Sequence, residues 1–188
     1  RECTVELVDP DLRSLWRAVS SAAGRPGALD VHWSTGECMP ELEPVDVVIA
    51  TEVLCYVEDP ERVVQQLLRR LRPGGIFLMS VEARWGWGMA MDVHEGTLDA
   101  FLGDGIVHVP GDRWVRTYTE EMVRDLLKGM DLIEIVPSHF AFSGPFENMV
   151  GPMDYERALS VESRLRQHPI AGKLNRAWMA AARQPGSL

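Results

Sequence analysis

The sequence predicts a single α/β domain with a mostly parallel sheet and helices on both of its faces. Residues 45–50 and 76–81 are short runs that are apolar at nearly every position, as in strands covered on both faces. A well-delimited helix separates the two runs, which gives a β-α-β unit with a right-handed crossover. With 188 residues, 46% of them hydrophobic and 25% charged, residues 1–188 have the size and composition of one globular domain.

Two further strands and a helix precede this unit. Residues 4–8 form a β-branched run that stops at Asp9-Pro10, which predicts a strand ending in a turn. Apolar residues at helical spacing over 12–19, followed by glycines and a proline, predict a helix. Residues 29–33 predict a second strand, which leads into a turn-rich segment.

The helix of the β-α-β unit has clear signals at both ends. Asp59 can cap it, Pro60 suits the first helical position, and Glu61 favours the positive end of the helix dipole. Its apolar side chains form one stripe. The tripeptide at 73–75, Pro-Gly-Gly, is expected to end the helix before the strand at 76–81.

Over residues 82–118 the apolar residues no longer follow the regular alternation of strands and helices. We call this segment the insert. A stretch of this length inside a compact domain usually carries function or forms its own elements. We expect a helix over part of it, roughly residues 89–102, with Gly86 and Gly88 as candidate hinges.

The C-terminal part predicts three more elements and a final strand. Thr119 caps a helix, residues 132–136 form a fifth strand, and residues 155–167 form a helix. Residues 177–182 predict a last strand, although their alanine content leaves a helix as the alternative.

Composition and charge exclude several classes of protein. A net charge of −9 argues against binding to nucleic acid, which needs basic stripes. No apolar run approaches the roughly 20 residues of a membrane span. The three cysteines cannot all pair and form no C-x-x-C motif, so we expect reduced core residues and no metal site.

Only two of the 19 basic residues are lysine, a bias typical of GC-rich bacterial genomes, and we expect a cytoplasmic bacterial protein.

Three motifs together resemble one enzyme family. They are Val45-Asp46-Val47-Val48-Ile49-Ala50, then Val53-Leu54-Cys55-Tyr56-Val57-Glu58-Asp59-Pro60, then Leu71-Arg72-Pro73-Gly74-Gly75. In this order and spacing they resemble the class I S-adenosylmethionine (SAM)-dependent methyltransferases, and most of all the methyltransferase type 11 group. The tripeptide Thr117-Tyr118-Thr119 is similar to the start of the next helix in that family. The resemblance implies a Rossmann-like sandwich that uses SAM.

The resemblance also implies which residues contact the cofactor. In an open parallel sheet, ligands bind beyond the carboxyl ends of the strands. The implied contacts are Asp9 to the ribose hydroxyls, Glu37 and Cys38 to the adenine, the Ala50 carbonyl to the methionine moiety, and Tyr56 to cofactor or substrate. A carboxylate suits a vicinal diol because it accepts two charge-assisted hydrogen bonds. Each position has a structural alternative: an Asp before Pro is a common turn residue, and a Tyr packs well as a half-buried aromatic.

One motif of the family is absent from the sequence. The family begins with a central strand and a Gly-x-Gly loop that holds the methionine end of SAM, whereas Gly74-Gly75 and Gly86-Trp87-Gly88 follow other strands. Without that central strand the sheet would fall into two halves with unpaired edges. We therefore expect the natural protein to have roughly 40 to 70 more residues before Arg1.

The insert is the predicted substrate side of the site. In the family this position commonly forms part of a lid over the substrate. The residues expected to line the substrate are Trp85, Trp87, Met91 and Trp114, with core packing as the alternative for the tryptophans. An oxygen acceptor benefits from a general base, and His94 and His108 are the candidates.

The predicted function is transfer of a methyl group from SAM to an oxygen or nitrogen atom of a small molecule, such as a secondary metabolite, sugar or lipid-like compound. One alternative is a non-catalytic scaffold that binds a partner through the tryptophan-rich insert. Another is a nicotinamide-dependent reductase, but that class uses a Tyr-x-x-x-Lys pair, and neither Tyr118 nor Tyr155 has a lysine four residues later. The sequence leaves the oligomeric state open, with a homodimer among the options.

Overall fold

The computed structural model describes residues 3–90, 97–109, 111, 113–149 and 154–186. The strands are β1 Thr4–Asp9, β2 Ala28–Trp33, β3 Val45–Thr51, β4 Leu71–Glu82, β5 Ile106–His108, β6 Trp114–Arg116, β7 Asp131–Ser138 and β8 Ala177–Arg183. The helices are α1 Leu12–Ala22, α2 Pro60–Leu68, α3 Arg84–Ala90, α4 Thr97–Leu102, α5 Glu120–Leu126, α6 Tyr155–Arg166 and α7 Ala171–Leu174, with short 3₁₀ turns η1 Leu54–Tyr56 and η2 Glu147–Met149. The α/β fold class is confirmed.

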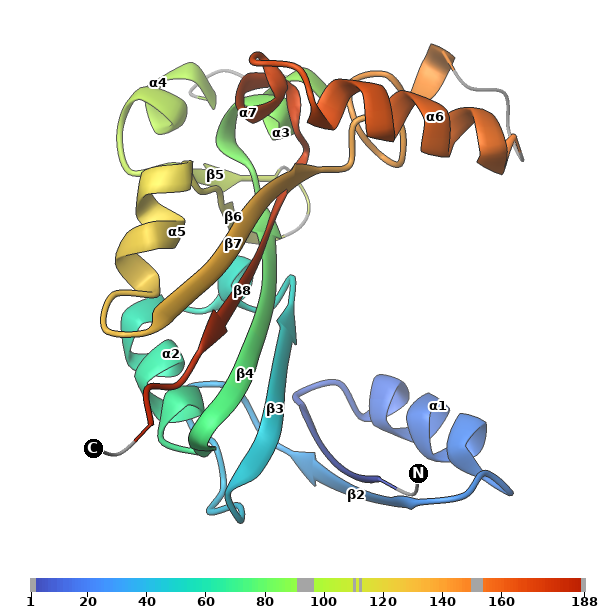
Figure 1. Cartoon of the computed structure of the whole chain (residues 1–188), viewed down its shortest axis with the longest axis vertical. Helices are drawn as coiled ribbons and strands as arrows, with labels where there is room; N and C mark the ends of the chain where they lie inside the picture. The colour runs from blue at the N-terminus through green and yellow to red at the C-terminus, as the bar shows by residue number, and fades with distance from the viewer. Residues whose placement is uncertain (1–2, 91–96, 110, 112, 150–153, 187–188) are drawn as a thin grey trace.

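The main sheet has four strands in the order β3-β4-β8-β7 (Figure 1). β3 and β4 pair in parallel with α2 between them in the chain, as the β-α-β prediction requires. β8 runs antiparallel to both of its neighbours, so the other three strands share one direction. The alanine-rich final segment is therefore a strand and not the alternative helix.

A second, two-stranded parallel sheet pairs β1 with β2, and α1 packs beside it. Within the described residues no hydrogen-bonded ladder joins β1 to β3, so each of these strands has one unpaired edge. Figure 1 shows this pair with α1 as a separate lobe at the foot of the molecule. The sheet is thus in two halves, as expected for a sequence without the family's central strand.

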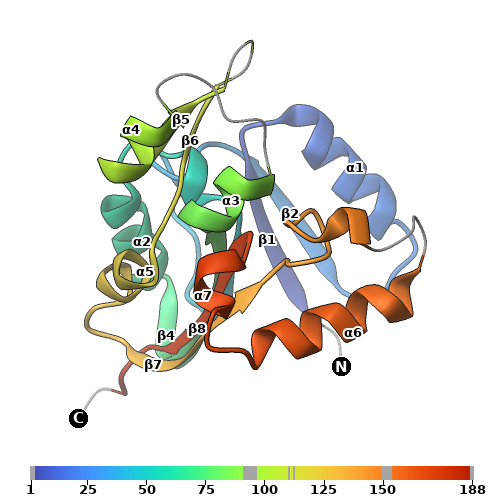
Figure 2. The same cartoon turned by 90° about the horizontal axis from the view of Figure 1, so that it is seen from above.

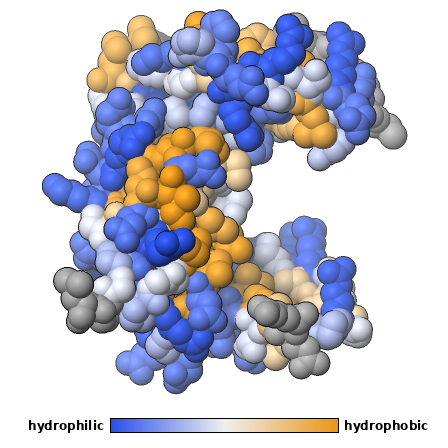
Figure 3. Space-filling view, viewed as in Figure 1, coloured by the Kyte–Doolittle hydropathy of each residue, from blue (hydrophilic) through white to orange (hydrophobic). Residues whose placement is uncertain are grey.

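Helices lie on both sides of the main sheet. α2 and α5 cover one face, while α1 and α6 lie on the other side at opposite ends (Figures 1 and 2). The core is densest under α2 and α5, where side chains such as Phe77, Val63 and Val123 are fully buried. The opposite face remains apolar and open: Ile49 is 67% exposed. Figure 3 shows apolar side chains gathered beside a deep hollow between the two ends of the molecule.

The predicted helix caps are confirmed. The Asp59 carboxylate accepts a hydrogen bond from the Arg62 N–H at 2.9 Å, and Thr119 caps α5 through the Met122 N–H. The prediction for Pro-Gly-Gly was wrong in detail, because α2 ends at Leu68 and the tripeptide lies inside β4. A glycine suits position 75 because a Cβ there would lie 2.9 Å from the Arg72 carbonyl oxygen.

The insert contains more structure than the predicted helix over 89–102. α3 begins earlier, α4 is separate, and β5 and β6 form an antiparallel hairpin that returns the chain to Tyr118. Residues 91–96 lie outside the described residues. Gly86 and Gly88 sit within α3 and are buried, with the Asn175 backbone and the Phe101 ring where a Cβ would be. They are sites of close packing, which argues against a hinge.

The expectation of three core cysteines was wrong for two of them. Cys55 is buried, whereas Cys3 and Cys38 are exposed, and all three are free. In the described ranges no helix is long and apolar enough to cross a membrane, and no cluster of ligating side chains could hold a metal ion.

Candidate functional site

The chain leaves β3 through a constrained turn at Glu52. Its φ of 59° lies in the left-handed region that non-glycine residues rarely adopt. Ser80 on β4 holds the turn, because its backbone carbonyl accepts from the Glu52 N–H at 3.0 Å and its hydroxyl donates to the Glu52 carboxylate at 3.1 Å. Such strain is kept where the surrounding structure fixes it, and it concentrates at functional sites.

A small pocket opens beyond the carboxyl ends of β3 and β4. Its volume is about 130 Å³. It is lined by Tyr56, Glu82, Trp87, Val109, Arg113, Trp114, Val115 and Arg176. These residues come from η1, the end of β4, α3, the β5–β6 hairpin and the segment before β8, so five parts of the chain meet here. We call this the strand-end pocket.

Its polar base is an ion pair between Glu82 and Arg176. Only 7% of the Glu82 side chain and 16% of the Arg176 side chain are exposed. The Arg176 guanidinium also lies 5.8 Å from the centre of the Trp87 ring. Burial lowers the pKa of Arg176, while the Glu52 carboxylate opposes that shift.

An arginine and a tyrosine of the pocket lining stack against each other. The Arg113 guanidinium lies 4.1 Å from the centre of the Tyr56 ring, which is a close cation–π contact. Burial raises the pKa of the Tyr56 hydroxyl, so it stays protonated at neutral pH and can donate a hydrogen bond.

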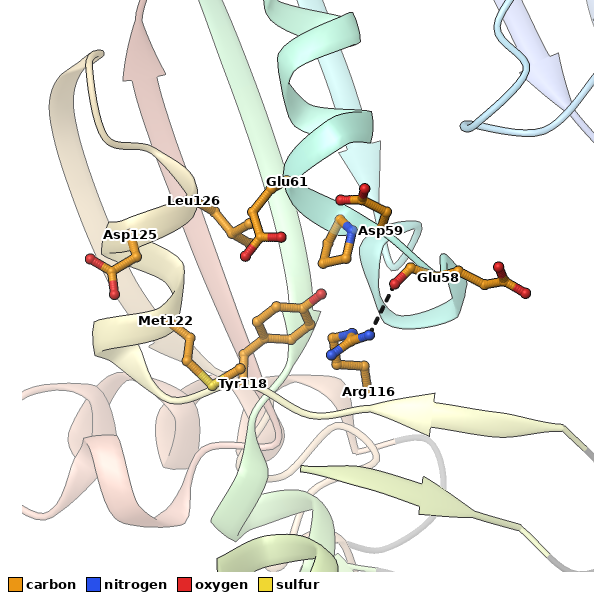
Figure 4. Close-up of a pocket in the computed structure, with 9 residues that line it drawn as sticks. Glu58, Asp59, Glu61, Arg116, Tyr118, Met122, Asp125 and Leu126 are labelled. Atoms are coloured by element: carbon orange, nitrogen blue, oxygen red, sulfur yellow. Dashed lines mark hydrogen bonds between the residues drawn. The ribbon is translucent and has the colours of Figure 1, made fainter. Parts of the chain in front are cut away.

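A larger cavity, of about 440 Å³, lies between α2 and α5 and is drawn in Figure 4. Four carboxylates surround it, and Arg116 donates from its guanidinium to the Glu58 carbonyl at 3.2 Å. None of the sequence-predicted cofactor or substrate residues lines it. Because it lies on the helix-covered side of the sheet, we place the candidate site at the strand-end pocket instead.

The predicted ribose ligand, Asp9, stands half-buried at the tip of β1. Its Oδ1 accepts a hydrogen bond from the Asp11 N–H at 2.7 Å, the arrangement of a turn residue. The rival carboxylate, Glu6, lies further back on β1 and is paired with His32 at 2.6 Å. Asp9 is therefore the carboxylate of β1 that lies at the strand end.

The predicted adenine contacts follow β2. The Glu37 carboxylate accepts from the Glu58 N–H at 3.1 Å, which ties this loop to the segment between β3 and α2. Cys38 is exposed, and its carbonyl accepts from the Ser34 hydroxyl. The tip of the β1–β2 lobe therefore adjoins the segment that follows β3. Ala50 is buried near the end of β3, and Tyr56 lines the strand-end pocket.

The predicted substrate residues divide into two groups. Trp87 and Trp114 both line the strand-end pocket, together with Tyr56. Trp85 packs edge-on against Phe101 at 6.1 Å and is not among the lining residues. Met91 and His94 lie outside the described residues. His108 is exposed on β5, opposite Trp114 in the hairpin.

Sequence reasoning missed the charged members of the site: Glu52, Glu82, Arg113 and Arg176. A signal was present, because Glu52 and Glu82 follow the two predicted buried strands almost directly and Arg176 immediately precedes the last one.

Comparisons with known proteins agree with this geometry. Residues 3–79 match the family described as a methyltransferase domain. A SAM-dependent methyltransferase from Mesorhizobium loti is 15% identical, with a TM-score of 0.64, and the match covers 96% of this chain and 80% of that one. A SAM-dependent methyltransferase from Methanosarcina mazei is 13% identical, with a TM-score of 0.62, and the match covers 98% and 83%.

A third solved structure is the N-methyltransferase NodS from Bradyrhizobium japonicum in complex with S-adenosyl-L-homocysteine. It is 16% identical, with a TM-score of 0.55, and the match covers 96% of this chain and 66% of that one. No curated protein sequence matches the chain. The family match and the shared fold confirm the resemblance to the class I SAM-dependent methyltransferases, a class of enzymes whose cofactor is SAM.

Proposed function

We propose that the protein transfers the methyl group of SAM to an oxygen or nitrogen atom of a small molecule. The observation that carries this proposal is the strand-end pocket, which lies beyond β3 and β4, where open α/β sheets bind ligands. Its aromatic and charged lining offers both the apolar contacts and the few polar groups that a small-molecule site needs.

The residues at the other strand ends fit the nucleoside half of SAM. Asp9 brings a carboxylate to the tip of β1, suited to a ribose diol, and Glu37 brings a second one after β2, suited to the adenine amine. The backbone carbonyl of Ala50 and the side chain of Tyr56 are our candidates for the methionine half. Cys38 is the second candidate beside the adenine.

When bound, SAM supplies an electrophilic methyl group for an in-line displacement. The chain must hold the acceptor atom in line and keep water away. We assign the holding role to Tyr56, Trp87 and Trp114, and the covering role to the insert, which would act as a lid. Trp85 and Met91 stay as further candidates for the lid. For an oxygen acceptor, His94 and His108 remain the candidate bases.

The acidic chain disfavours a nucleic acid as acceptor. Its three free thiols and arginine-rich composition support a reducing, bacterial cytoplasmic setting. A homodimer stays open as the assembly.

Calorimetric titration of the full-length protein, including any residues that precede Arg1, with SAM and with S-adenosylhomocysteine tests the proposal. We expect micromolar dissociation constants for both. Asp9→Asn keeps an acceptor for the Asp11 N–H but removes the charge, and should weaken binding at least tenfold. Asp30→Asn, on the exposed part of β2, is the matched control and should leave binding unchanged.

Absence of binding for both compounds would overturn the proposal and favour a non-catalytic scaffold. Equal affinity of the Asp9→Asn variant and the unaltered protein would remove Asp9 from the site.

A further inference from the structure

We infer that the methyl acceptor is an aromatic acid, a flat ring that carries a carboxylate or another oxyanion, and that Arg176 recognises its charge. This inference rests on the proposed function and names the class of its substrate. It is carried by the volume of the strand-end pocket, by the aromatic side chains that line it, and by the Arg176 donors that the ion pair with Glu82 leaves unused.

The volume and the lining of the pocket suit a ligand with a single aromatic ring. A volume of about 130 Å³ is close to that of an engineered cavity of ~150 Å³ that holds benzene. Three aromatic side chains, Tyr56, Trp87 and Trp114, line it with two valines. Aromatic rings prefer offset or edge-on contacts with other rings, which a flat ligand between these side chains would make.

The buried ion pair supplies the charge recognition. Arg176 lines the pocket and has five N–H donors, whereas its ion pair with Glu82 engages the terminal nitrogen Nη1. Arginine matches oxyanions in a bidentate manner, so an incoming carboxylate can use donors that Glu82 leaves unused.

A second cation faces the same space. Arg113 lines the pocket and lies over the Tyr56 ring. The nearby carboxylates are Glu82, which already pairs with Arg176, and Glu52, which accepts from Ser80. Both acidic groups thus have partners inside the protein.

An amine acceptor fits this arrangement less well. To bind Glu82 it would have to displace Arg176, which would leave a buried guanidinium without its counter-charge. Breaking a buried pair by losing one partner is strongly unfavourable. An acidic ligand joins the pair without breaking it.

The test uses three ligands of nearly equal size: benzoate, benzamide and benzylamine. Their binding is followed by the fluorescence of the tryptophans and by calorimetry, with S-adenosylhomocysteine present. We expect benzoate to bind at least tenfold more tightly than benzamide and benzylamine. Arg176→Gln should abolish this preference, whereas Arg183→Gln, on the exposed end of β8, should preserve it.

Glu82→Gln is the second variant, and the comparison of the three ligands on the unaltered protein keeps the test decisive if neither variant folds. Removal of the competing carboxylate should free Arg176 and increase the affinity for benzoate at least threefold. Equal affinities for the three ligands, or tighter binding of benzylamine, would overturn the inference. S-adenosylhomocysteine binding measured in the same samples separates the outcomes: normal binding without a preference for benzoate removes only the inference, and no binding removes the proposed function.

Discussion

The phenol hydroxyl of Tyr118 donates a hydrogen bond to the backbone carbonyl of Leu54 at 2.7 Å. Tyr118 follows the β5–β6 hairpin, whereas Leu54 begins the turn after β3. The bond therefore joins the end of the insert to the turn that carries Tyr56, a residue that lines the strand-end pocket. Both residues are almost completely buried, so water cannot replace the bond if it is lost.

Tyr118→Phe should lower the free energy of unfolding by about 1 to 3 kcal/mol, because it leaves the Leu54 carbonyl without this donor. Urea denaturation measures the change. Tyr155→Phe is the matched control, since Tyr155 is 62% exposed, and should shift stability by less than about 0.5 kcal/mol. Equal stability of both variants would show that the hydrogen bond contributes nothing.

Glu162 on α6 anchors the loop that follows β7. Its Oε1 accepts from the backbone N–H groups of Phe140, Ala141 and Phe142 at 2.7, 2.8 and 3.2 Å. Glu162→Gln should destabilise the protein by about 1 to 3 kcal/mol, because a neutral amide oxygen accepts these bonds more weakly than a carboxylate. Thermal unfolding compares it with Glu156→Gln on the exposed side of α6. A melting temperature no lower than that of the control would contradict the anchoring role.

The elements predicted correctly carry local signals. Asp59 with Pro60 marks the start of α2, and Thr119 marks the start of α5, because a cap acts within a few residues of itself. The continuous apolarity of β3 marked a strand, but the expected cover on both faces was wrong: Val48 and Ala50 are buried, whereas Ile49 on the other face is exposed. For the β-α-β unit, therefore, local signals predicted the order of the elements and the start of α2, but not the residue at which α2 ends.

The charged part of the site could not be predicted in the same way. Glu82 and Arg176 meet only because β8 inserts beside β4, and no periodicity in either segment reports that pairing. The β5–β6 hairpin is also short, so three residues on each side give too little alternation to recognise. Family resemblance supplied Tyr56, and the aromatic content of the insert supplied Trp87 and Trp114. The structure brings these three together, but neither signal supplied the ion pair beside them.

At Gly86, helix propensity and steric fit predict opposite effects of an alanine substitution. Alanine is favoured over glycine inside a helix by about 1 kcal/mol, yet a Cβ at this position of α3 would collide with the backbone oxygen of Asn175. Because backbone cannot yield as a side-chain tip can, we expect Gly86→Ala to lower the unfolding free energy by about 1 to 3 kcal/mol. Gly186→Ala, which meets nothing within 4 Å, serves as the control. Stabilisation by Gly86→Ala would show that helix propensity dominates.

Thiol labelling distinguishes the three cysteines. Cys3 and Cys38 are exposed, whereas Cys55 is buried, and burial raises the pKa of its thiol. At pH 8 we expect two thiols to react rapidly with a chromogenic disulfide and the third to react only on unfolding. Cys38→Ser should remove one rapid equivalent, and Cys55→Ser should remove the slow one. Three rapid equivalents in the native protein would contradict the burial of Cys55.

Stability should fall at high pH, and the two buried acids explain why. Burial raises the pKa of both Cys55 and Tyr118 in the folded protein above their ordinary values of 9.0 and 10.0. The unfolded chain therefore loses these protons first, and the folded state loses stability as pH rises above about 9. Each group contributes up to about 1.4 kcal/mol per pH unit above its ordinary pKa.

Urea denaturation between pH 7 and 11 measures this slope. Tyr118→Phe should flatten the decline above pH 10, and Cys55→Ala should flatten it from pH 9 upward, although each variant begins from a lower stability at neutral pH. Tyr155→Phe should leave the slope unchanged, because an exposed phenol ionises alike in both states. A slope that is the same in all three variants would mean that neither buried group controls the alkaline transition.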